Sequence, residues 1–285
     1  MALLDNGTQV SMFASGLDHS EGIAWGLDGY VYSGGEAGQI YRISLNSGKV
    51  TEIANTGGFI LGLALDASNN IYACDVSDRS IKKITPDGYV TTYATGTDED
   101  PFITPNYPVF DSKGNLYVCD SGDWKQDNGK IFKISPGGIS EVWDRRLKEF
   151  PNGICISPNE GYLVVAMSLN PPRIAKVLID RDGNPDKIDT LVEIPGTVPD
   201  GVLFDRQGFI YVSCYRPDRI YRLSPLGELE ILADDFEGTV ISAPTNLAFC
   251  GNGLDVLLGT NLGRWHISKY NADAIGLPLN YPELK

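Results

Sequence analysis

Short runs of alternating apolar and polar residues, separated by turns rich in glycine, asparagine and proline, recur along the whole chain. Six segments share one outline, in which an apolar run, a turn and a second β-rich run are followed by a loop and a third run. Equivalent positions in the second runs are Val31, Ile71, Leu116, Leu163, Ile210 and Val256. Their successive spacings are 40, 45, 47, 47 and 46 residues. The alternation is typical of strands with one buried face.

The third runs repeat in step with the second ones and alternate apolar with basic residues, as in Gln-Ile-Tyr-Arg-Ile at residues 39–43. In the sixth segment we expect this run at residues 264–267. Repeats of this length with several short strands are the signature of propeller blades. We therefore predict an all-β, six-bladed β-propeller that forms a single domain over residues 1–285. The last segment lacks a fourth strand, and we expect a strand at residues 8–14 to complete it and remove the open edge.

Charge and cysteine content narrow the function. The formal net charge of −14 and the pI of about 4.5 disfavour nucleic-acid binding, which needs clustered basic residues. The chain contains no run of 18 apolar residues, so we expect no membrane span. The N-terminus does not resemble a signal peptide. The five cysteines are an odd number without a Cys-x-x-Cys pair, so we expect a reduced, cytoplasmic protein. The oligomeric state, monomer or small homo-oligomer, stays open.

One position of the repeat is polar in five of the six segments. It lies ten residues before each second-run position, or eleven in the fourth segment, where the turn is one residue longer. The residues at this position are Glu21, Leu61, Asn106, Asn152, Asp200 and Asn246. Each opens the innermost strand of its predicted blade, and in a propeller those strand ends surround the central channel.

Two carboxylates and three carboxamides around one axis indicate a bound cation. Like charges that converge in a closed channel repel and desolvate one another unless a cation compensates them. The donors are all oxygens, which hard cations prefer. We expect one divalent cation, for which Ca²⁺ is the best fit; Mg²⁺ and Mn²⁺ stay open, and Zn²⁺ fits the ligand types less well. The alternative is that single Asn and Asp residues at strand starts cap turns, but that does not explain five polar residues in register.

The segments that carry these residues resemble the SMP-30/gluconolactonase/luciferin-regenerating-enzyme family. The resemblance rests on SEGIAW at residues 20–25, PNGICISP at 151–158, PDGV at 199–202 and PTNLAF at 244–249. It implies a six-bladed propeller that binds Ca²⁺ or Zn²⁺ and hydrolyses lactones.

Carried over residue by residue, the resemblance implies that Glu21, Asn152 and Asp200 are metal ligands and that Asp200 is the catalytic base. A further motif of the family, Arg followed by an Asn-Asp pair, corresponds here to Thr104, Asn106 and Tyr107. The absent arginine argues against sugar lactones, and Tyr107 favours a less polar lactone.

The predicted reaction is lactone hydrolysis by water that the metal activates. The chain direction brings the loops that follow the second strands to the same end of the propeller as the six residues around the axis. The loop at residues 120–129 is the candidate lid. The expected substrate-binding residues are Asn106, Tyr107, Asn246, Asp120, Trp124, Met167 and Tyr215. Met167 and Tyr215 also fit simple packing between blades. His19, two residues before Glu21, is a candidate proton shuttle.

Three other functions stay open. Partial resemblance to paraoxonase-like and diisopropyl-fluorophosphatase-like propellers suggests a phosphotriesterase-like hydrolase on the same metal site. A non-catalytic propeller that binds protein partners is the second. A carbon–nitrogen condensing enzyme is the third, because YSGG at residues 32–35 and FPNG at 150–153 also suit strictosidine-synthase-like proteins.

Overall fold

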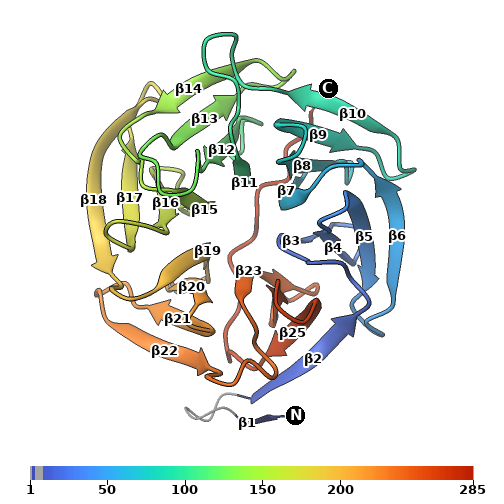
Figure 1. The fold of residues 1–285 in the computed structure, drawn as a ribbon. Helices are drawn as coiled ribbons and strands as arrows, with labels where there is room; N and C mark the ends of the chain where they lie inside the picture. Colours follow the sequence, from blue (N-terminus) through green and yellow to red (C-terminus); the bar gives the residue numbers. More distant parts are fainter. Residues whose placement is uncertain (1, 4–8, 285) are drawn as a thin grey trace.

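The protein is a ring of six antiparallel β-sheets around a central axis, as Figure 1 shows. The computed structural model describes residues 2–3 and 9–284. All regular elements within these residues are strands. The described residues therefore contain no helix that is long and apolar enough to cross a membrane. The predicted fold class is confirmed.

Five sheets follow chain order from the axis outward. The first blade contains β3 (Ile23–Trp25), β4 (Tyr30–Gly34), β5 (Gln39–Ser44) and β6 (Val50–Asn55). The second contains β7 (Ile60–Leu65), β8 (Ile71–Asp75), β9 (Ser80–Ile84) and β10 (Val90–Ala94). The third contains β11 (Pro105–Phe110), β12 (Leu116–Asp120), β13 (Lys130–Ile134) and β14 (Ser140–Asp144). The fourth contains β15 (Pro151–Ile156), β16 (Tyr162–Met167), β17 (Arg173–Ile179) and β18 (Pro185–Glu193). The fifth contains β19 (Val198–Phe204), β20 (Ile210–Arg216), β21 (Arg219–Leu223) and β22 (Leu229–Asp234).

The sixth blade joins both ends of the chain. It contains β23 (Pro244–Cys250), β24 (Val256–Asn261), β25 (His266–Tyr270), β2 (Gln9–Ser15) and β1 (Ala2–Leu3). The pairing of β2 with β25 confirms the predicted N-terminal closure, although Thr8 lies outside the described residues.

The third strand of the sixth blade begins two residues later than predicted. Arg264 and Trp265 have positive φ angles of 65° and 53° and form the turn before β25. His266 is therefore the first residue of that strand, because its register with β24 starts at Asn261.

Aspartates organise several hairpins between the first and second strands. Asp111 Oδ1 accepts hydrogen bonds from the backbone N–H groups of Lys113 and Asn115, and Gly114 has a φ of +86°. An Asp at the start of such a turn and a glycine in the left-handed region favour a tight hairpin. Asp66 and Asp205 accept equivalent pairs of bonds, which fixes the register of the strands that lead to the axis.

The apolar core lies between neighbouring blades. Each of the core clusters combines side chains from facing blades, as with Trp143 of the third blade and Val165 of the fourth. Burial of each large aliphatic side chain contributes about 1.5–3 kcal/mol to folding. All five cysteines are buried, free thiols.

The C-terminal segment, residues 271–284, crosses the axis at one end of the ring (Figure 1, red). Tyr281 donates its hydroxyl to Trp25 O (2.7 Å), and Asn280 Nδ2 donates to Phe110 O (3.0 Å). The segment covers an apolar cavity of about 320 Å³ that the innermost strands of all six blades line. The end that it closes is the one toward which these strands run, so the opposite end is left for a functional site.

Candidate functional site

The six residues predicted to surround the axis, hereafter the ring residues, all lie at the start of an innermost strand. Leu61, Asn106 and Asn152 are the second residues of β7, β11 and β15. Asp200 and Asn246 are the third residues of β19 and β23, and Glu21 comes just before β3. Figure 1 shows these strands closest to the axis. The ring therefore surrounds the end of the channel remote from the C-terminal segment.

The pairing register shifts at this place in five innermost strands. The shift lies between Pro105 and Tyr107 in β11, between Pro151 and Ile154 in β15, and at the equivalent points of β7, β19 and β23. Such bulges bend a strand and redirect a side chain, and they are common beside active sites. The ring side chains thus leave the normal alternation of the strand.

Gly201 permits close packing at one of these bulges. A Cβ atom on it would lie 2.5 Å from Asn246 Oδ1 and 2.7 Å from Thr245 O of the next blade. Only a residue without a side chain allows the two strands to approach this closely. The Pro-Asp-Gly sequence of residues 199–201 therefore has a steric reason at its third position.

The two ring carboxyl groups influence each other electrostatically. Burial and then the charge of Glu36 raise the pKa of Glu21 to about 7. Burial also raises the pKa of Asp200 well above its ordinary value; the charge of Glu21 adds to this increase, and a hydrogen bond with Asn152 opposes it. Carboxylates in such surroundings are stable at neutral pH only with a compensating positive charge.

Two ring oxygens are buried without a hydrogen-bond partner, Asn152 Oδ1 and Asp200 Oδ1. Buried acceptors of this kind are uncommon and call for a ligand. Together with Glu21 they offer only oxygen donors, the set that Ca²⁺ prefers. The residues therefore fit a hard divalent cation.

The other ring residues differ in their contacts. Asn106 is buried, and its Nδ2 donates to Ser121 Oγ (3.0 Å). Asn246 is buried, and its Nδ2 donates to Glu21 O (3.4 Å). Leu61 contributes an apolar side chain, so the second blade supplies no polar group to the ring itself.

Four predicted wall residues take different places. Asp120 is fully buried and accepts backbone hydrogen bonds from Ile103 and Thr104, so it anchors a rim loop and does not face a ligand freely. Trp124 is 51% exposed and packs edge-on against Phe150, with ring centroids 4.9 Å apart. Trp124 is thus an exposed aromatic side chain, and its contact with a substrate stays a prediction.

Tyr215 is half-buried, and the Arg216 guanidinium lies 4.9 Å from its ring centroid. Met167 is fully buried in the core between the third and fourth blades. Its side chain packs between the blades, which was the alternative to a pocket contact.

Tyr107 faces the apolar cavity on the axis. Its hydroxyl donates to Ile23 O (3.3 Å) of the first blade, and its ring lines the axial cavity. This position departs from the predicted contact with substrate at the rim. Position 107 follows the bulge at Asn106, and the bulge reverses the side to which the next residue points.

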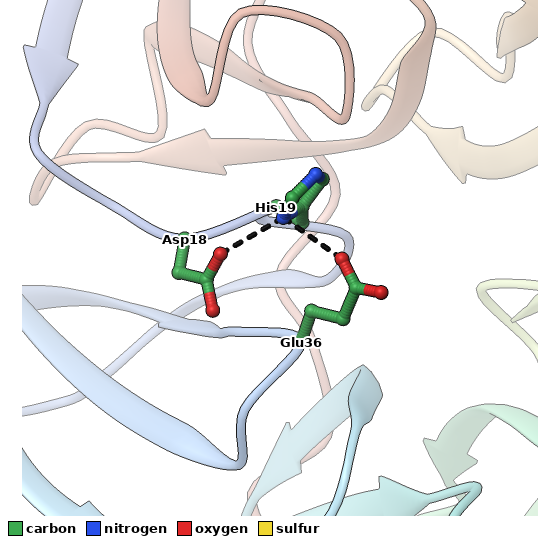
Figure 2. Close-up of side chains that lie close together, drawn as sticks. All are labelled: Asp18, His19 and Glu36. Carbon is green, nitrogen blue, oxygen red and sulfur yellow. Dashed lines mark hydrogen bonds and ion pairs between the residues drawn. The ribbon is translucent and has the colours of Figure 1, made fainter.

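A second group of ionisable residues lies beside the ring. His19 Nδ1 is 2.8 Å from both Asp18 Oδ1 and Glu36 Oε2. Figure 2 shows the His19 side chain between these two carboxyl groups. The hydrogen bond from His19 is the main cause that lowers the pKa of Asp18. The His19 ring packs against Trp265 at 4.3 Å between centroids. Among the described residues this is the group of His, Cys, Asp and Glu side chains close enough to share an ion. Its members already satisfy one another, whereas the ring oxygens do not.

Two serines that the sequence analysis did not single out contact the ring. Ser121 Oγ donates to Pro151 O and Ser168 Oγ donates to Pro199 O, both at 2.7 Å. Asn152 Nδ2 in turn donates to Ser168 Oγ (3.3 Å). Each serine stands five residues after the second-run position of its repeat, and the two repeats are consecutive. A comparison of the repeats at this position could therefore have identified them.

Comparison with known families assigns the chain to one of them. The family model described as "SMP-30/Gluconolactonase/LRE-like region" matches residues 87–261, more than half of the chain. The chain belongs to this family. Its resemblance to the family, seen first in four short motifs, is confirmed.

Two curated proteins resemble this chain in sequence. A gluconolactonase of Zymomonas mobilis is 26% identical over 264 residues, which cover 80% of this chain and 72% of the relative. The protein STRICTOSIDINE SYNTHASE-LIKE 6 of Arabidopsis thaliana is 26% identical over 220 residues, covering 69% and 56% of the two chains.

Solved structures confirm the fold of this family member. A gluconolactonase of Xanthomonas campestris has a TM-score of 0.79 at 20% identity, covering 97% of this chain and 92% of the other. A luciferin-regenerating enzyme has a TM-score of 0.81 at 17% identity, with 98% and 100% covered. Regucalcin of Agrobacterium tumefaciens, described as a calcium-binding protein, has a TM-score of 0.77 at 19% identity, with 96% and 94% covered.

Proposed function

We propose that the protein is a lactonase that holds one divalent cation between Glu21, Asn152 and Asp200 and uses Asp200 as its base. The observation that carries the proposal is the buried ring, in which two carboxyl groups of raised pKa lie with two unpartnered oxygens. Family membership and the gluconolactonase relative support hydrolysis of a cyclic ester.

The nature of the donors supports Ca²⁺ as the cation. Carboxylate and carboxamide oxygens are its usual ligands, and the fold neighbour described as calcium-binding agrees with this choice. When bound, the cation would polarise the ester carbonyl and lower the pKa of a water molecule. Mg²⁺, Mn²⁺ and Zn²⁺ are the alternatives that a metal screen must compare.

Asp200 supplies the proton transfer in this mechanism. Its carboxylate accepts a proton at Oδ2, the oxygen not assigned to the cation, as the water oxygen bonds to the carbonyl carbon. The same proton passes to the ring oxygen of the lactone as the acyl–oxygen bond breaks, which gives a hydroxy acid. A base with a raised pKa suits this return of the proton. Asn106 and Asn246 border the space in which the substrate carbonyl would lie, and they would orient it.

The rim favours a lactone of low polarity. The exposed indole of Trp124 and the ring of Phe150 offer apolar surface near the ring. Thr104 stands where the family motif has an arginine, and its backbone is bonded to Asp120. We infer that aromatic or aliphatic lactones bind better than polyhydroxylated sugar lactones.

The surroundings in which the protein works follow from its thiols and its charge. Five free, buried cysteines support a reducing compartment, and we propose the cytoplasm. The net charge of −14 supports small-molecule partners over nucleic acids.

The test is a hydrolysis screen of aliphatic, aromatic and sugar lactones by pH-stat, on EDTA-treated protein and after addition of single metals. We expect activity only with a divalent cation. Asp200→Asn, which keeps the size and one oxygen of the side chain, should lower kcat by about 10²–10⁴-fold with the fold intact. Lactone hydrolysis that survives both EDTA and Asp200→Asn would contradict the proposal. Faster turnover of organophosphates than of lactones would favour the phosphotriesterase-like alternative.

A further inference from the structure

The direction of an asparagine carboxamide decides whether it can hold a cation. Oδ1 accepts or coordinates, whereas Nδ2 only donates, and the two atoms lie on opposite sides of one planar group. Asn152 is useful as a ligand only if Oδ1 faces the ring. Some neighbouring group must therefore fix the side to which each atom turns.

Ser168 is placed to fix it. A hydroxyl has one hydrogen, and Ser168 commits that hydrogen to Pro199 O at 2.7 Å, an atom that cannot donate. Towards Asn152 the Ser168 oxygen can then act only as an acceptor. The carboxamide must present Nδ2 to it, as observed at 3.3 Å, because the opposite orientation would bring two oxygens together.

The consequence is visible at the other carboxamide atom. Asn152 Oδ1 is buried without a hydrogen-bond partner, on the side away from Ser168. The hydrogen bond from this carboxamide that lowers the pKa of Asp200 can come only from Nδ2, so it leaves Oδ1 without a partner as well. The orientation holds even though the Asn152 oxygen gains no protein partner from it.

Ser121 repeats this arrangement one blade earlier. Its hydroxyl donates to Pro151 O at 2.7 Å and accepts from Asn106 Nδ2 at 3.0 Å. Ser121 and Ser168 are both fully buried. The acceptor carbonyls belong to the residues just before Asn152 and Asp200, so each serine links one ring residue to the strand that carries the next.

We infer that Ser121 and Ser168 are positioning residues that turn the carboxamide oxygens of Asn106 and Asn152 towards the axis. This inference rests on the proposed function, since it concerns the cation site of the same ring. The serines do not touch the reacting atoms; they act through the asparagines, as hydrogen-bond partners of metal ligands generally do.

The experiment measures Ca²⁺ affinity by isothermal titration calorimetry and the stability of the metal-free protein by urea unfolding. Ser168→Ala should weaken Ca²⁺ binding by roughly tenfold or more. The matched control is Ser268→Ala. Ser268 is also fully buried, accepts from Asn261 Nδ2 (3.0 Å) and donates to Val240 O (2.6 Å), but it contacts no ring residue. The Ser268→Ala variant should be less stable than the wild type and should bind Ca²⁺ with unchanged affinity.

A double-mutant cycle isolates the carboxamide direction. In an Asn152→Asp background both side-chain oxygens can bind the cation, so adding Ser168→Ala should change the affinity by less than about twofold. An equal loss from Ser168→Ala in both backgrounds would overturn the inference, as would no loss in the wild-type background. Should Ser168→Ala fail to fold, Ser168→Cys keeps a similar size and offers a weaker acceptor, and the same loss is expected.

The outcomes separate this inference from the proposed function. Wild-type protein that binds no divalent cation would overturn both. Wild-type protein that binds Ca²⁺ as tightly as the Ser168→Ala variant would overturn the positioning role alone and leave the proposed lactonase site in place.

Discussion

The charge of Glu21 raises the pKa of Asp200, although the two residues belong to the first and the fifth blades. Burial acts in the same direction on both groups. Two acids that disfavour each other's ionised form make the metal-free ring sensitive to pH and make a cation stabilising.

The stability of the metal-free protein should therefore fall as the pH rises. A carboxyl whose pKa is higher in the folded than in the unfolded state binds more protons when folded, so its stabilising contribution is lost as the pH rises through that interval. For Glu21 the interval runs from about 4.5 to about 7. Thermal unfolding of EDTA-treated protein between pH 5 and 7.5 checks this expectation.

Glu21→Gln and saturating Ca²⁺ should each flatten this pH dependence. Glu36→Gln is the control, because it removes a charge that raises the pKa of Glu21 but leaves the carboxyl group; the fall should then shift to lower pH. Identical pH profiles for wild type and Glu21→Gln would show that the ring carboxyl does not cause the fall.

The packing at Gly201 predicts a localised steric effect. Gly201→Ala would place a Cβ atom against Asn246 Oδ1 and the Thr245 carbonyl, and the carbonyl belongs to a fixed strand. We expect a loss of about 1–3 kcal/mol in the free energy of unfolding, together with reduced activity because Asp200 is adjacent.

Gly161→Ala is the matched control for this substitution. Its added Cβ would meet only the Asn159 side chain, at 3.3 Å, and its φ lies outside the left-handed region. Urea unfolding of both variants gives the comparison. Equal small effects at the two glycines would mean that the strands of the fifth and sixth blades can separate without cost.

The repeat made the fold and the ring predictable. Six runs with similar spacings indicated the blades, and one shared position indicated the ring to which Glu21, Asn152 and Asp200 belong. The family resemblance then implied that these three are the metal ligands. The family match and the β-sheet ring confirm the architecture.

The side chains that line the site were less predictable, because the direction of each one depends on local backbone geometry. The bulge at Asn106 places Tyr107 along the axial cavity, and Met167 packs between blades. The repeat pattern contains no signal for a bulge. The positive φ angles of Arg264 and Trp265 likewise displaced the expected start of the last strand by two residues.

The C-terminal segment should stabilise the whole ring. Its bonds reach Trp25 in the first blade, Phe110 in the third and Glu160 in the fourth. Removal of residues 277–285 would expose the apolar cavity that the segment covers, so we expect a loss of several kcal/mol in the free energy of unfolding. Tyr281→Phe, which removes one hydrogen bond, should cost about 1 kcal/mol.

Leu279→Ala serves as the control for the segment, since Leu279 is 47% exposed and should tolerate truncation better than its buried neighbours. Denaturant unfolding of the three variants tests the ranking. A truncated protein as stable as the full chain would contradict the role assigned to the segment.

Trp124 predicts substrate preference at the rim. Its exposed indole packs edge-on against Phe150, two residues before Asn152, and offers an aromatic surface to a substrate. An aromatic contact contributes about 0.5–1.5 kcal/mol, so Trp124→Ala should raise KM for aromatic lactones roughly two- to tenfold and leave kcat unchanged. Small aliphatic lactones, which have no aromatic ring to pack against the indole, should keep the wild-type KM. Phe236→Ala, at a side chain that is 95% exposed, controls for loss of surface hydrophobicity in general. If Trp124→Ala raised KM equally for both classes of lactone, the indole would be acting on the shape of the rim and not on an aromatic substrate.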